Sequence, residues 1–178
     1  MKSLFYLQLL LIIVININFS FLEEIQNGLY IIKNKANFNL CLKNTSLYFS
    51  SEESCQFLIH KKDTKPLHEY DVEPKDKNIY YNIEDEITGN KLYFDEITKS
   101  LSVSDDLNTK EDSSNFLWEF LIKKDKSSQE LFYEIKTKNK KNFISYEDSK
   151  EKTTKAFCES SWTALTEDRD TKIKLIQI

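Results

Sequence analysis

Tyr30-Ile31-Ile32, Tyr81-Asn82-Ile83 and Tyr133-Glu134-Ile135 are three similar stretches that recur at spacings of 51 and 52 residues. Each places apolar side chains at alternate positions, as a half-buried β-strand does. A period of this size is typical of folds built from a repeated supersecondary unit. The repetition therefore predicts three related segments, at about residues 28–62, 79–124 and 131–178.

Three further apolar patches follow each of these stretches. They lie at residues 40–42, 47–49 and 57–59, then at 92–94, 101–103 and 118–120, and finally at 143–144, 156–158 and 173–175. Polar clusters separate the patches and read as turns. We therefore expect an all-β fold of twelve short strands, in which three pseudo-symmetric units bury their apolar faces together.

The N-terminus has the features of a secretory signal peptide. Lys2 supplies a positive charge, residues 4–15 are apolar except for Gln8, and the small residue Ser20 follows. The uninterrupted apolar run is shorter than the ~20 residues that span a bilayer. We expect a signal peptide at residues 1–22 and one secreted domain, free of the membrane, at residues 23–178. An uncleaved N-terminal anchor is the alternative.

Composition argues against several classes of function. The formal net charge is −4, which predicts no attraction to nucleic acid, and two glycines are too few for a glycine-rich phosphate loop. His60 and His68 with Cys55 match no zinc-ligand spacing. Cys158 with His60 has the residue types of a nucleophile pair but no further supporting feature. We expect a protein that is not an enzyme and holds neither metal nor cofactor.

The three cysteines suggest one disulfide and one spare thiol. Cys41 and Cys55 would close a short loop in a secreted chain and add about 3 kcal/mol to its stability. Cys158 is then either buried as a small apolar residue or available for an intermolecular bond. Asn44-Thr45-Ser46 is a sequon, which makes Asn44 a candidate glycosylation site.

Gly28-Leu29-Tyr30-Ile31-Ile32-Lys33-Asn34, followed by Leu40-Cys41-Leu42, resembles the opening of ricin B-type lectin domains. As a pattern, the resemblance extends over residues 23–178. It implies a β-trefoil, the twelve-stranded fold of that family, and a carbohydrate-binding function. Fungal cysteine-protease inhibitors, Kunitz-type inhibitors and growth-factor-like proteins share the same skeleton, so the fold alone does not decide the function.

The resemblance also implies where a sugar would bind. A competent ricin B-type repeat carries an Asp after its second strand, an aromatic residue at the end of its third strand, and an Asn-Gln-x-Trp pattern. Lys43 and Ser54 replace the Asp and the Asn in the first repeat. Tyr146 and Asp170 replace them in the third.

Only the second repeat keeps part of the binding set. Asp95 stands at the Asp position, and Asn115-Phe116-Leu117-Trp118 keeps the Asn and the Trp. We therefore take Asp95 and Asn115 as candidate sugar ligands and Trp118 as a core residue of that repeat. Ser104 stands where the stacking aromatic is expected, so the alternative is that Asp95 is a turn residue and Asn115 caps a loop.

The leading hypothesis is a secreted, monomeric, non-enzymatic module whose partner is a glycan or glycoprotein. One rival is a β-trefoil inhibitor that meets a protease through loop 61–78 or loop 104–115. Another is a structural coat protein cross-linked through Cys158. A basic run would suit a sulfated glycan or a phosphate, or would simply be solvated surface, and consists of Lys136, Lys138, Lys140 and Lys141.

Overall fold

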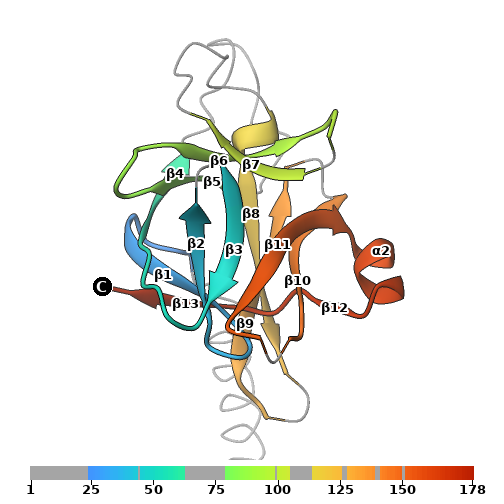
Figure 1. Ribbon diagram of the computed structural model, residues 1–178. Helices are drawn as coiled ribbons and strands as arrows, with labels where there is room; N and C mark the ends of the chain where they lie inside the picture. The colour runs from blue at the N-terminus through green and yellow to red at the C-terminus, as the bar shows by residue number, and fades with distance from the viewer. Residues whose placement is uncertain are drawn as a thin grey trace, which may run out of the picture.

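The computed structural model describes residues 24–43, 45–62, 79–98, 100–104, 114–125, 128–138, 141–149 and 151–178. These residues form an all-β fold of thirteen strands with a 3₁₀-helix and one short α-helix (Figure 1). The first segment holds β1 (Gly28–Asn34), β2 (Asn39–Lys43), β3 (Ser46–Ser50) and β4 (Phe57–Lys62). The second holds β5 (Tyr80–Asp85), β6 (Lys91–Asp95), β7 (Ser100–Ser104), η1 (Ser114–Phe116) and β8 (Trp118–Lys124). The third holds β9 (Leu131–Thr137), β10 (Asn142–Glu147), β11 (Thr153–Ser160), α2 (Ser161–Thr166), β12 (Arg169–Asp170) and β13 (Ile173–Gln177).

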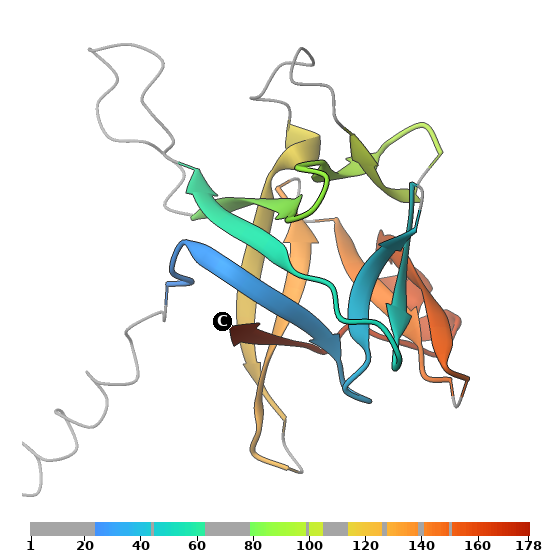
Figure 2. The ribbon, with the colours of Figure 1, turned by 60° about the vertical axis from the view of Figure 1, so that its left-hand side comes forward.

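Nine of the strands close into an antiparallel barrel. Hydrogen-bonded neighbours run in the circuit β1, β4, β5, β8, β9, β10, β11, β3, β2 and back to β1. The remaining strands extend it: β13 lies between β1 and β9, the β6–β7 hairpin continues from β5, and β12 adds to β10. Figure 2 shows β1 beside β4 and the long β8–β9 hairpin. Closure leaves few unpaired edges in the described sheet.

The prediction of a β-trefoil with twelve strands in three pseudo-symmetric repeats is wrong. The sheet has thirteen strands joined through one closed circuit, and the three segments are not equivalent. β3, the third strand of the first segment, pairs with β11, the third strand of the third segment. β7, the third strand of the second segment, pairs with β6 and lies at the end of the strand order among the described residues. The third segment also contains α2 and β12, which lie between two predicted apolar patches, where only a turn was expected.

The positions of twelve of the thirteen strands, in contrast, were predicted correctly, because each of the twelve apolar patches lies in a strand and β12 alone was missed. Alternation brings Ile32, Ile83 and Ile135 into the centre of the barrel, where all three are completely buried. Tyr81 packs edge-on against Phe120, with ring centroids 5.2 Å apart. The core therefore draws on all three segments.

The predicted disulfide between Cys41 and Cys55 is confirmed. It joins β2 to the loop before β4 and closes a loop whose ends are 14 residues apart, which corresponds to about 3 kcal/mol in the loop-entropy account. Cys158 is free and only 2% exposed, because it points from β11 into the core. The buried interpretation of Cys158 is therefore confirmed, and a cross-link through this thiol would require β11 to open.

Membrane-spanning helices are not found within the described ranges, where neither helix is long and apolar enough to cross a bilayer.

Candidate functional site

Asp95, the first predicted sugar ligand, holds the turn between β6 and β7. Its Oδ1 accepts hydrogen bonds from the backbone N–H groups of Ile97 at 2.8 Å and Thr98 at 3.3 Å. Its Oδ2 accepts from the Thr98 hydroxyl at 2.7 Å. Asp residues often stabilise turns in this way, by bonding the backbone two or three positions ahead. The geometry is thus that of a turn-capping carboxylate.

The other two residues of the predicted set lie on neighbouring elements. Asn115 is half-buried in η1. Trp118 begins β8 and is completely buried, and its indole N–H donates to the backbone carbonyl of Leu92 at 3.0 Å. Trp118 therefore ties β8 to β6 from inside the barrel, and its side chain does not reach solvent.

An aromatic pair that was not among the predicted site residues lies next to Asp95. Tyr93 is two positions before Asp95 on β6, so both side chains lie on the outer face of the strand. The ring of Tyr93 packs against Phe116 of η1, with centroids 5.2 Å apart and planes 30° from parallel. Strand alternation counted back from Asp95 would have found Tyr93. The family pattern instead directed attention to Ser104.

A groove of about 360 Å³ lies where β3, β7 and β11 converge, beside this hairpin. β11 pairs with β3 only from Thr153 to Lys155, and beyond that point the two strands separate. The outer edge of β7 forms the third side; in Figure 1 the β6–β7 hairpin crosses above β3 and β11. The volume falls within the ~300–1,000 Å³ range that is usual for small-molecule sites. The lining residues are Thr45, Ser46, Leu47, Thr98, Ser100, Leu101, Ser102, Lys155, Ala156, Phe157, Cys158 and Glu159.

A chain of hydroxyl groups forms the β7 wall of the groove, and Asp95 orients it. The single proton of the Thr98 hydroxyl goes to the Asp95 carboxylate. The Ser100 hydroxyl lies 2.7 Å from that of Thr98, so Ser100 must be the donor of this bond. Because the hydroxyl proton of Ser100 is used in this bond, its oxygen can act only as a hydrogen-bond acceptor toward a ligand. Asp95 thus acts on the groove through Thr98.

The opposite wall is the outer face of β11. Lys155, Phe157 and Glu159 alternate along that face, while Ala156 and Cys158 point inward. The guanidinium of Arg169, from β12, lies 3.8 Å from the centroid of the Phe157 ring, and its Nη1 lies 2.5 Å from Glu159 Oε2. These stacked and ion-paired contacts fix the position of Phe157 and Glu159.

Both carboxylate oxygens of Glu159 have partners. Oε2 accepts from Arg169, and Oε1 accepts a hydrogen bond from the hydroxyl of Ser145. Glu159 is also the one carboxylate among the lining residues, whereas glycoside hydrolysis uses a pair. Burial raises the pKa of the Cys158 thiol well above its ordinary value, so this thiol stays protonated at neutral pH and is a poor nucleophile. The groove is thus equipped to hold a ligand by hydrogen bonds and packing.

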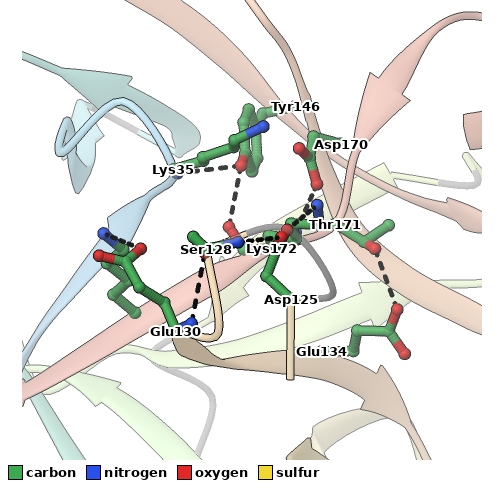
Figure 3. A network of polar contacts seen from close by, with 10 residues as sticks. Lys35, Asp125, Ser128, Glu130, Glu134, Tyr146, Asp170, Thr171 and Lys172 are labelled. Atoms are coloured by element: carbon green, nitrogen blue, oxygen red, sulfur yellow. Dashed lines mark hydrogen bonds and ion pairs between the residues drawn. The ribbon is translucent and has the colours of Figure 1, made fainter. Parts of the chain in front are cut away.

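A second, much smaller cavity of about 30 Å³ lies near Lys172. Figure 3 shows the polar network beside it: the Tyr146 hydroxyl donates to the Lys172 carbonyl at 2.8 Å and accepts from the Lys35 backbone N–H at 3.0 Å. The hydrogen bond from Lys172 Nζ to Asp125, 2.7 Å long, raises the pKa of the lysine. Asp170 Oδ1 accepts from the Lys172 backbone N–H at 2.9 Å. The cavity has room for about one water, so this network joins three loops rather than binding a sugar.

The described lysines of the predicted basic run do not line the groove and are partly engaged. Lys136 pairs with Glu119 at 3.2 Å, and the Nζ of Lys138 lies 5.1 Å from the centroid of the Tyr80 ring, so neither is simply solvated.

Among the described residues the one close set of metal-ligand types is Cys41, Glu53 and Cys55, and the two cysteine sulfurs of this set form the disulfide. The following predictions lie outside the described residues: residues 1–22, Asn44, His68, Lys140, most of loop 61–78 and most of loop 104–115.

No family model matches this chain, and no curated protein sequence matches it. Among solved structures it is similar to a chain of the Haemophilus ducreyi cytolethal distending toxin, with a TM-score of 0.57 and 13% identity over 84% of this chain and 83% of that chain. A chain of the cytolethal distending toxin from Actinobacillus actinomycetemcomitans gives the same TM-score and identity, over 84% of this chain and 91% of the other. At this identity the similarity establishes a shared fold with chains of two bacterial toxins.

Proposed function

We propose that this protein is a secreted, non-enzymatic glycan-binding module whose site is the groove between β3, β7 and β11. The observation that carries the proposal is the two-sided chemistry of the groove. Thr98, Ser100 and Lys155 are polar residues of its lining, and Phe157 is a partly exposed aromatic one. A sugar ring needs both, because it presents hydroxyl groups on its edge and C–H groups on its faces.

This proposal modifies the role that the ricin B-type resemblance implies for the second segment. Asp95 becomes a positioning residue, which fixes the Thr98 and Ser100 hydroxyls at the β7 wall. Asn115 lies in η1 beside the Tyr93–Phe116 pair, is not among the groove-lining residues, and is therefore not a ligand in this proposal. The disulfide between Cys41 and Cys55 is compatible with secretion, because such bonds persist in oxidising compartments.

Blocking the groove should abolish glycan binding without unfolding the protein. Thr45 is exposed at the groove rim, so Thr45→Trp would fill the groove with an indole while leaving the core untouched. We expect at least a tenfold loss of signal on a glycan array. Thr153→Trp is the matched control, because Thr153 is an exposed residue of β11 that does not line the groove. Both proteins should be made in bacteria, which leave Asn44 unglycosylated.

Two outcomes would overturn the proposal. One is that the unaltered protein binds no glycan on the array. The other is that Thr45→Trp binds as well as Thr153→Trp while both retain the circular dichroism spectrum and melting temperature of the parent protein.

A further inference from the structure

The two charged residues that line the groove differ in how they are paired. Lys155 and Glu159 are its two charged lining residues, and the Glu159 carboxylate is 11% exposed and paired with Arg169. Arg169 also lies 3.7 Å from Glu147, an exposed residue outside the groove lining. Glu159 therefore already has a cationic partner, Arg169, which is not itself a lining residue of the groove.

Lys155, in contrast, has no acidic partner among the residues that the structure describes. Its Nζ lies 5.4 Å from the centroid of the Phe157 ring, a contact that holds the ammonium group near the β11 wall without neutralising it. Because the side chain is exposed, its charge is partly screened by water. A ligand that enters the groove removes part of that water and strengthens any charge interaction with Lys155.

We propose that the groove selects an anionic saccharide, bearing a carboxylate or a sulfate group, over the neutral saccharide of the same backbone, and that Lys155 contacts the anion. This inference rests on the proposed glycan-binding function. The acceptor oxygen of Ser100 on the opposite wall then takes a hydrogen bond from a sugar hydroxyl. One wall thus offers a cation and the other an acceptor, which also fixes the orientation of the ligand.

The test is a glycan array that carries the same oligosaccharide backbones in neutral, sialylated and sulfated forms, followed by titration calorimetry on the best-bound backbone. We expect the anionic form to bind about fivefold tighter than the neutral form at low salt, and the preference to shrink at 0.5 M NaCl. The sialylated and sulfated arms show whether carboxylate or sulfate is the preferred anion.

Lys155→Gln should remove the preference for the anionic form. The matched control is Lys152→Gln, which removes an exposed lysine three residues away that pairs with Glu52 and does not line the groove. The inference is overturned if neutral and anionic forms bind equally, or if Lys155→Gln keeps the preference. Either result leaves the proposed glycan-binding function intact. If the protein binds no glycan at all, the proposed function is overturned as well.

Discussion

Replacing Trp118 with alanine should lower the free energy of unfolding by about 3–5 kcal/mol. Trp118 is among the largest completely buried side chains of the barrel, so truncation removes its buried apolar surface and leaves a cavity. It also leaves the buried carbonyl of Leu92 without the indole N–H that now lies 3.0 Å away, which adds to the cost. Chemical denaturation followed by far-ultraviolet circular dichroism measures the difference directly.

The other tryptophan of the chain is the control for this experiment. Trp162 is 72% exposed on α2, so Trp162→Ala should change the free energy of unfolding by no more than about 0.5 kcal/mol. If the two substitutions cost the same, Trp118 does not occupy the barrel core, and the packing of β8 against β6 is not as described.

Removing the positive charge of Arg169 should cost about as much as removing the Trp118 side chain. Arg169 and Glu159 have side chains only 15% and 11% exposed, with 2.5 Å between their charged atoms. Arg169→Met leaves Glu159 as a largely buried charge without its partner, and such breaks cost about 3–5 kcal/mol. The substitution also removes the cation that packs on Phe157, so the β11 wall of the groove should loosen.

A double-mutant cycle separates the charge effect from the loss of packing. Arg169→Met combined with Glu159→Met should recover much of the lost stability, because no unpaired charge then stays buried. Lys152→Met breaks the exposed pair with Glu52, whose side chains are 77% and 60% exposed, and should cost less than about 1 kcal/mol. If the double variant has the same free energy of unfolding as Arg169→Met alone, the loss of stability does not come from an unpaired Glu159 charge.

The sequence was informative wherever a structure depends on neighbours along the chain. Alternation of apolar residues located the strands, because side chains of a strand point to opposite faces in turn. The disulfide was predictable because Cys158 lies far along the chain from the close pair Cys41 and Cys55. Hydrogen-bond partners of strands are a long-range property, so the β3–β11 pairing and the closed circuit through it were not visible in a repeated Tyr-x-Ile pattern.

The candidate site depends on the same long-range pairing. Its lining comes from three strands that are distant in sequence, and it exists because β3 and β11 separate after Lys155. Asp95 was found from a family pattern, but its role through Thr98 and Ser100 depends on the hydrogen bonds of the folded turn. The pairing of Glu159 with Arg169 has no signature in the sequence.

The most direct test of a glycan site between β3, β7 and β11 is to map ligand binding residue by residue. Backbone amide resonances of the ¹⁵N-labelled protein should be followed by nuclear magnetic resonance during titration with the best anionic saccharide from the array. We predict shifts concentrated in residues 45–47, 98, 100–102 and 155–159, with little change around Asn115 and Phe116. Shifts that cluster around η1 and the Tyr93–Phe116 pair, with the groove amides unmoved, would contradict the proposed site.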